Sequence, residues 1–165
     1  MSRKIETIPV QPRGWVRPHP CRVLGRIRNL IVCWAPEAVH YQGNLNESYR
    51  ARRRYCTIAT RTGEGHYVNV SGFMLTQWQA LRLALKLAHE QIDWAEWLEN
   101  YGDSGTAAGR RVLELTQQAV HMPDDQSRAE EKRANLFRWI ADPNWEDRRD
   151  RYYLELVELE EFMGA

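Results

Sequence analysis

The N-terminal half of the chain alternates short apolar runs with polar stretches that contain Gly and Pro. The run Leu30–Trp34 is rich in β-branched residues and is ended by Pro36, which predicts a buried strand. Two further strand-like runs, Tyr55–Thr60 and His66–Val70, flank the Gly-containing connection Arg61–Gly65 and predict a β-hairpin. We therefore expect an antiparallel sheet of about three strands.

A long amphipathic helix is predicted to follow the hairpin. Thr76 and Gln79 form a T-x-x-Q capping box, which is typical of a helix start. Apolar residues then recur at helical spacing, and the pattern ends near Tyr101, just before Gly102. The members of this apolar stripe are Trp78, Leu81, Leu85, Ala88 and Ile92.

Three more helices are predicted downstream. One covers Thr106–Val120, the next begins at Ser127 in an S-x-x-E capping box with Glu130, and the last begins at Asp142 with Pro143 in the first helical position. Because the strands precede the helices, we predict an α+β fold. Its small antiparallel sheet of about three strands in the N-terminal half would be packed by about four helices in the C-terminal half.

Length and composition favour a single domain over residues 1–165, in which residues 1–20 form an extended arm that contains Pro12, Pro18 and Pro20. Hydrophobic residues make up 43% of the chain and include seven Trp and seven Tyr, which favours a packed core over disorder. The sequence lacks a membrane-length apolar stretch and a secretory signal, so we expect a cytoplasmic protein with no membrane partner. The odd number of cysteines favours reduced thiols at positions 21, 33 and 56.

Charge is distributed unequally along the chain. Residues 1–61 hold twelve Arg and Lys against three Glu, whereas residues 62–165 hold eleven basic against nineteen acidic residues. The formal net charge of +1 therefore conceals a basic segment and an acidic segment, which favours electrostatic pairing with a partner or within the chain. The basic peak consists of Arg50, Arg52, Arg53 and Arg54, and it is flanked by Tyr49 and Tyr55.

Acidic residues also occupy positions that local electrostatics disfavour. In the predicted long helix Glu90, Asp93, Glu96 and Glu99 approach the C-terminal end, where the helix dipole is already negative. Three interpretations stay open. The arginines of the arm and the basic peak pair with these acids in the same chain, or the same pairing joins two copies in a homodimer. Alternatively, the basic peak is free to contact phosphates while its tyrosines stack on bases.

Candidate catalytic and metal-binding residues are few. His89 and Glu90 make up half of an H-E-x-x-H zinc motif, but the second His is replaced by Asp93, and the alternative is an exposed polar helix edge. Cys56 and His66 lie on the two strands of the predicted hairpin as a candidate Cys/His pair, although a thiol in a buried strand is typically inert. The sequence contains no complete nucleotide-binding glycine motif, so we expect neither a cofactor nor a metal.

These observations predict a non-catalytic cytosolic binding protein that engages an acidic macromolecular partner, either a protein or a nucleoprotein complex. A phage or plasmid accessory protein that inhibits a host system fits these traits. Two alternatives stay open: a non-sequence-specific nucleic-acid binder that uses the Arg cluster, and a small enzyme with a Cys/His or His/Glu centre. The residues predicted to contact the partner are Tyr49, Arg50, Arg52, Arg53, Arg54, Tyr55 and Trp97.

Overall fold

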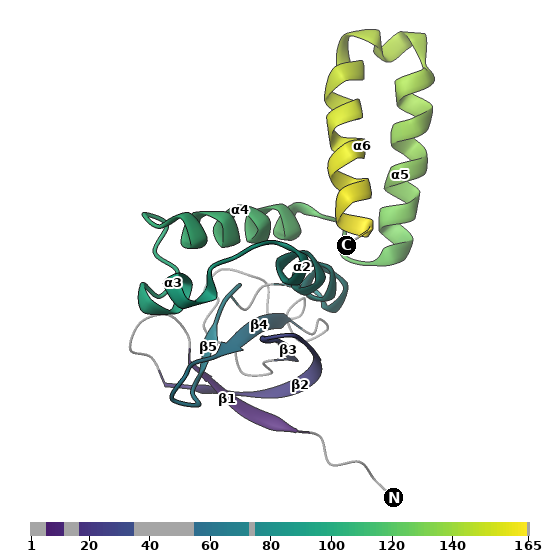
Figure 1. The fold of residues 1–165 in the computed structure, drawn as a ribbon. Helices are drawn as coiled ribbons and strands as arrows, with labels where there is room; N and C mark the ends of the chain where they lie inside the picture. Colours follow the sequence, from purple (N-terminus) through teal and green to yellow (C-terminus); the bar gives the residue numbers. More distant parts are fainter. Residues whose placement is uncertain (1–5, 12–16, 35–54, 73–74, 165) are drawn as a thin grey trace, which may run out of the picture.

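The strands of the N-terminal half close into a barrel (Figure 1). The computed structural model describes residues 6–11, 17–34, 55–72 and 75–164. The strand order is β1-β2-β3-β4-β5, and β1 closes the barrel by pairing in parallel with β5, whereas the other neighbours are antiparallel. The strands are β1 (Thr7–Gln11), β2 (His19–Ile27), β3 (Leu30–Trp34), β4 (Cys56–Arg61) and β5 (Tyr67–Asn69). The fold is α+β as predicted, but its sheet is a closed five-stranded barrel rather than a smaller open sheet.

Two of the strands lie where the sequence predicted an extended arm. In its described residues, this stretch forms β1 and the beginning of β2. Pro9 and Pro20 lie directly opposite each other in the β1–β2 pair. Both missing N–H groups therefore fall at the same position of the ladder, and the residue pairs on either side can still form backbone hydrogen bonds. The prolines are therefore compatible with a strand pair, and the expected arm is corrected here. A hairpin turn at Arg28, whose φ is +53°, then joins β2 to β3.

The barrel has a core on each side of its wall. Its interior holds small and branched side chains: Ile8, Val10, Cys21, Ile31, Cys33 and Ala59. The outer faces of β3, β4 and β5 contribute to a second core that includes residues of the helices, among them Leu30, Val32, Ile58, Leu83 and Leu87. Because β3 is largely buried on both faces, its sequence reads as a continuous apolar run rather than as an alternating pattern. Most of β4 is buried as well, but its sequence includes the buried polar residues Thr57 and Thr60.

The helices form a layer over the barrel and a projecting hairpin (Figure 1). Helices α2, α3 and α4 lie beside the barrel, with α2 in contact with β3 and β4. Helices α5 and α6 pack on each other and extend away from the body. None of the helices in the described residues combines the length and apolar character needed to cross a membrane. The helices are α2 (Gln77–His89), α3 (Trp94–Glu99), α4 (Ala107–His121), α5 (Gln126–Ala141), the 3₁₀ helix η2 (Pro143–Arg148) and α6 (Arg149–Met163).

The predicted long helix is interrupted between α2 and α3. Glu90 ends α2 in an extended conformation, and Asp93 begins α3 by accepting a hydrogen bond from the Glu96 amide at 3.0 Å. Asp93 and Glu96 therefore lie at a helix N-terminus, where negative charge is favourable. The predicted unfavourable placement of these two acids is wrong. The predicted stop is confirmed, because Gly102 adopts φ +69° just after α3.

The other predicted helix starts are largely confirmed. The Thr76–Gln79 capping box is formed in both directions, and Asp142 caps η2, with Pro143 in its first turn. The start of α5 differs from the prediction, because Asp125, and not Ser127, accepts the capping hydrogen bond. A kink at Trp145 then separates η2 from α6 within the segment predicted as one helix.

Candidate functional site

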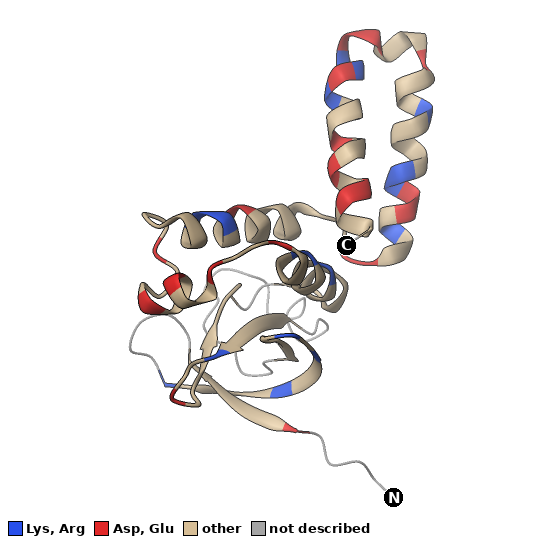
Figure 2. Cartoon of the chain, viewed as in Figure 1, with Lys and Arg blue, Asp and Glu red and all other residues tan. Residues whose placement is uncertain are grey.

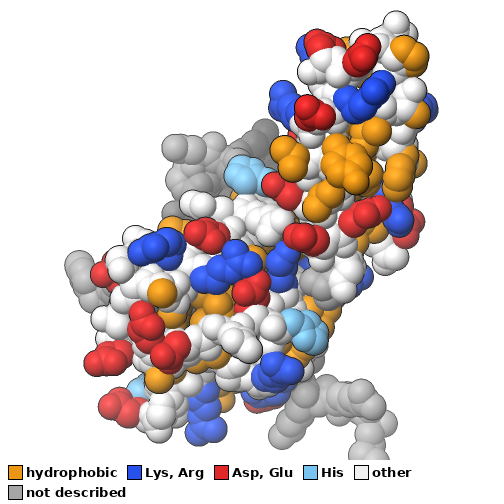
Figure 3. Space-filling model, turned by 45° about the horizontal axis from the view of Figure 1, so that its top comes forward, with side chains coloured by type: hydrophobic (Ala, Val, Ile, Leu, Met, Phe, Trp, Pro, Cys, Tyr) orange, Lys and Arg blue, Asp and Glu red, His pale blue; other side chains and the backbone are white. Residues whose placement is uncertain are grey.

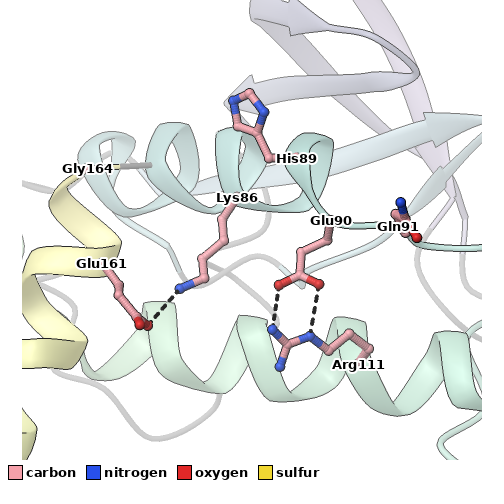
Figure 4. Close-up of a pocket in the computed structure, with 7 residues that line it drawn as sticks. All are labelled: Lys86, His89, Glu90, Gln91, Arg111, Glu161 and Gly164. Carbon is pink, nitrogen blue, oxygen red and sulfur yellow. Dashed lines mark hydrogen bonds and ion pairs between the residues drawn. The ribbon is translucent and has the colours of Figure 1, made fainter.

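A charged pocket lies where α2, α4 and the C-terminal end of α6 meet (Figure 4). Its volume is about 760 Å³. It is lined by Lys86, His89, Glu90, Gln91, Arg111, Glu161 and Gly164. Two of these residues, His89 and Glu90, are the metal ligands that the sequence suggested. The arrangement of the pocket therefore tests whether they can bind a metal together.

A bidentate ion pair between Glu90 and Arg111 crosses from the end of α2 to α4. Arg111 Nε donates to Glu90 Oε2 at 3.3 Å, and Arg111 Nη2 donates to Glu90 Oε1 (Figure 4). These hydrogen bonds lower the pKa of Glu90 and raise the pKa of Arg111. The carboxylate is therefore charged and engaged at neutral pH, which makes it a poor general base or metal ligand.

A second ion pair joins α6 to α2 at the other side of the pocket. The Lys86 ammonium lies 3.8 Å from Glu161 Oε2, and the Lys86 side chain is only 15% exposed (Figure 4). With the Glu90–Arg111 pair, these groups place two cations against two carboxylates. The pocket lining therefore carries no excess of either charge, and its ion pairs fasten three helices to one another.

The predicted His/Glu centre is not assembled in this pocket. His89 projects from α2 away from the Glu90 carboxylate (Figure 4). Within the described ranges, no group of three or more His, Cys, Asp or Glu side chains is arranged to hold a metal ion. The candidate zinc half-motif is therefore separated by helix geometry, because adjacent residues on a helix point in directions about 100° apart.

The predicted Cys/His pair is not assembled either. Cys56 is fully buried at the start of β4, whereas the His66 side chain is exposed, just before β5. The strand register pairs Arg61 with Tyr67, so Cys56 and His66 lie near opposite ends of the hairpin. At about 3.3 Å per residue, they are separated by roughly 15–20 Å, which is too far for proton transfer between them.

The acidic residues of the helices pair mainly with cations that also come from the helices and their connections. Glu90 and Glu161 have the partners described above, and Arg133 Nε lies 3.2 Å from Glu160 Oε1 between α5 and α6. Two shorter-range pairs are Asp124 with Arg128 and Glu155 with Arg151. Among the described residues, the acids are therefore not neutralised by arginines from the N-terminal third, which was one of the three open interpretations.

The arginines of the barrel make different contacts. Arg26 pairs with Glu6 of the same barrel, and Arg28 donates to the Ala88 carbonyl at the C-terminal end of α2. The Arg22 guanidinium stacks on Trp34, with 5.0 Å between its carbon and the ring centroid. Arg17 and Arg22 are exposed and have no carboxylate partner among the residues that the structure describes. Figure 2 shows the difference: red and blue intermingle on the helices, whereas the strands carry few charges.

Strand register places Arg22, the fourth of the nine residues of β2, in a row that crosses four strands. Arg22 pairs with Thr7 of β1 and with Trp34 of β3, and Trp34 pairs in turn with Cys56 of β4. We call this row the Arg22 row. The chain segments that join it carry Arg3, Lys4 and the Arg50–Arg54 cluster in the sequence.

Most of the predicted partner contacts lie outside the described residues, namely Tyr49, Arg50, Arg52, Arg53 and Arg54. The other two lie in the core, because Tyr55 is 6% exposed and Trp97 is 1% exposed. Trp97 packs edge-to-face with Trp94, at 5.8 Å between ring centroids. Neither ring is at the surface, where the predicted role required it. The contact that sequence reasoning missed is the stack of Arg22, which is exposed, on the partly buried Trp34.

A hollow of about 1090 Å³ lies between the β4–β5 turn and α3. Its lining includes the carboxylates Glu64 and Glu99 and the rings of Tyr67 and Tyr101. This hollow therefore differs in character from the Arg22 row, because it carries carboxylates where the row carries an exposed arginine.

Comparisons with protein-family models, with curated proteins and with solved structures found no match for this chain.

Proposed function

We propose that this protein is a non-catalytic binding protein whose barrel engages an acidic macromolecule through the surface around the Arg22 row. The supporting observation is that the ion pairs of the helical acids, among the described residues, use cations of the helices and their connections. The chain is nearly neutral as a whole, but its ion pairs do not join its basic and acidic segments in the described residues. Positive charge near the barrel thus stays available to a partner.

The geometry of Arg22 supports a binding role. Its stack on Trp34 holds the guanidinium in place while leaving its outward N–H groups in solvent. A guanidinium held in this way loses little side-chain entropy when it grips a carboxylate or phosphate. The sequence adds the Arg50–Arg54 cluster, which is covalently joined to Tyr55 at the start of β4. We propose that this cluster extends the same contact surface.

Two further observations favour binding over catalysis. Neither candidate catalytic pair is brought together, and the cysteines at positions 21, 33 and 56 are buried and form no disulfide. Reduced thiols also agree with a reducing compartment, so we place the protein in the cytoplasm.

Binding to polyanions at several salt concentrations tests the proposal. The probes are a fluorescent single-stranded DNA oligonucleotide, the corresponding duplex, and poly-glutamate. We expect binding at low salt that weakens steeply as salt rises, because phosphate or carboxylate contacts release counterions. Preference for DNA identifies nucleic acid as the partner class, whereas preference for poly-glutamate identifies an acidic protein.

Matched variants locate the surface. R22Q should weaken binding and lower the slope of log Kd against log salt by about one. Substitution of the four cluster arginines by Gln should weaken binding further. R110Q is the control, because Arg110 is an exposed arginine on α4. Absence of binding to all three probes at low salt would refute the proposal, and so would an equal loss in R110Q.

A further inference from the structure

The projecting α5–α6 hairpin exposes several large apolar side chains. Phe137 is 51% exposed, Tyr153 is 58% exposed, and Leu154 and Val157 are also exposed. Hydrophobic side chains gather on one face of this hairpin in the space-filling view (Figure 3). We call Phe137, Tyr153 and Val157 the Phe137 face.

Helical spacing places Phe137, Tyr153 and Val157 on the same side of the hairpin, whereas Leu154 directly follows Tyr153 and points about 100° away from it. Arg133 and Phe137 are four residues apart on α5, as are Tyr153 and Val157 on α6, so each pair shares a helix face. The Arg133–Glu160 ion pair, at 3.2 Å, crosses between the helices on this side and brings the two faces together. The Arg133 guanidinium also lies over the Phe137 ring, at 5.7 Å from its centroid. The ring is therefore held in position while it remains exposed.

The rest of the molecule does not cover this face in the described residues. The hairpin is anchored at its base, where Phe162 contacts Trp78 with ring centroids 5.6 Å apart. Its own buried seam is narrow and centres on Ala129, Leu136, Leu156 and Leu159. In an isolated helical hairpin, each helix buries only the side that faces the other helix. In a four-helix bundle, a second apolar side of each helix is also buried, because two helix pairs pack on each other.

The exposed area supplies part of what a small dimer interface needs. An aromatic side chain offers on the order of 200 Å², so Phe137 and Tyr153 each leave about 100 Å² of surface uncovered. With Val157, the face offers roughly 250 Å² of apolar surface. A standard interface buries about 800 Å² per partner, a little over half of it apolar. The Phe137 face therefore supplies about half of the apolar part.

The charges of the two helices are complementary. Helix α5 carries four basic and two acidic residues, a net charge of +2, whereas α6 carries two basic and five acidic residues, a net charge of −3. A two-fold axis along the hairpin would place α5 of one copy on α6 of the other, which sets unlike charges against each other. The alternative axis would place α5 on α5 and α6 on α6, which sets like charges together.

We propose that a second copy of this chain packs on the Phe137 face, forming an isologous four-helix bundle in which α5 of each copy lies against α6 of its partner. The proposal does not depend on the proposed function of the barrel. It requires only that the hairpin face be free in the folded monomer.

Sedimentation equilibrium over a range of protein concentrations tests this. The wild-type chain should shift from 19.4 kDa towards twice that mass as concentration rises. F137S/Y153S should raise the dissociation constant at least about tenfold, because aromatic side chains at an interface centre are typical hot spots. Both residues are exposed, so the variant should keep the wild-type circular dichroism spectrum.

The matched control is Y101S/L113S, which removes an exposed aromatic and an exposed aliphatic side chain outside the hairpin. This control should dimerise like the wild type. Three results would overturn the proposal: a wild-type chain that stays monomeric at its highest attainable concentration, undiminished dimerisation of F137S/Y153S, or an equal loss in Y101S/L113S. A monomeric wild type would mean that another segment or another protein covers the face.

Discussion

Replacing Gly109 by Ala tests how closely α4 is packed on the turn that precedes it. An ideal Cβ at Gly109 would lie 2.1 Å from the carbonyl oxygen of Asp103 and 2.7 Å from that of Gly102. The Asp103 oxygen is fixed in place, because it accepts hydrogen bonds from the Thr106 amide at 3.0 Å and from Thr106 Oγ1 at 2.7 Å. Thr106 is itself the N-cap of α4, so the turn cannot move without loss of the cap.

Two opposing effects decide the outcome. Overpacking costs typically about 1–3 kcal/mol, and a clash with fixed backbone belongs at the upper end of that range. Replacing Gly by Ala in a helix otherwise contributes about 1 kcal/mol of stability. We therefore expect G109A to lower the free energy of unfolding by about 2 kcal/mol and the Tm by roughly 4–8 °C.

Urea denaturation monitored by circular dichroism measures this difference. G63A is the matched control, because a Cβ at Gly63 would meet no atom within 4 Å. Its midpoint should stay close to that of the wild type. The sign of the G109A effect is the decisive result: an unchanged or higher stability would mean that helix propensity dominates and that the close approach to Asp103 is not real.

Two further predictions concern titrating groups. Because Arg111 lowers the pKa of Glu90 in the folded state, the stability that Glu90 contributes is present above the ordinary carboxyl pKa and is lost as pH falls through the folded-state value. E90Q should therefore destabilise the chain by about 1 kcal/mol at pH 7 and progressively less in acid, whereas E158Q should not; a pH-independent E90Q effect would contradict this. Burial raises the pKa of Cys21 and of Cys33 to about 12, so iodoacetamide should label them slowly at pH 8 in the native state and rapidly in urea, as measured by mass spectrometry. Native labelling at the rate of an unfolded thiol would contradict that burial.

Features that depend on neighbouring residues were predictable from the sequence. The Thr76–Gln79 box and the Asp142–Pro143 start are confirmed, because a cap is decided within one helical turn. The break before α3 has the same kind of signal, since Asp93 and Glu96 repeat the spacing of a capping box. The apolar stripe through Ile92 concealed it, because periodicity alone does not show where a helix is interrupted.

Features that depend on distant residues were not predictable. The parallel pairing of β1 with β5, which closes the barrel, joins segments more than fifty residues apart. The Glu90–Arg111 pair likewise spans α2 and α4 across 21 positions. Exposure depends on the same long-range packing. Trp97 could be judged a surface or a core residue from its sequence, and only the packing of α3 on the rest of the chain decides between them.

The two proposed surfaces lie on different elements, so each can be tested without the other. A dimer formed through the hairpins would carry two Arg22 rows. A long polyanion that reached both rows would bind more tightly, because its second contact would form at a high effective concentration, and its apparent Kd would then depend on protein concentration. A short oligonucleotide would contact one row only, and its Kd would report the barrel surface alone. Probe length therefore separates contact with the barrel from avidity that dimerisation supplies.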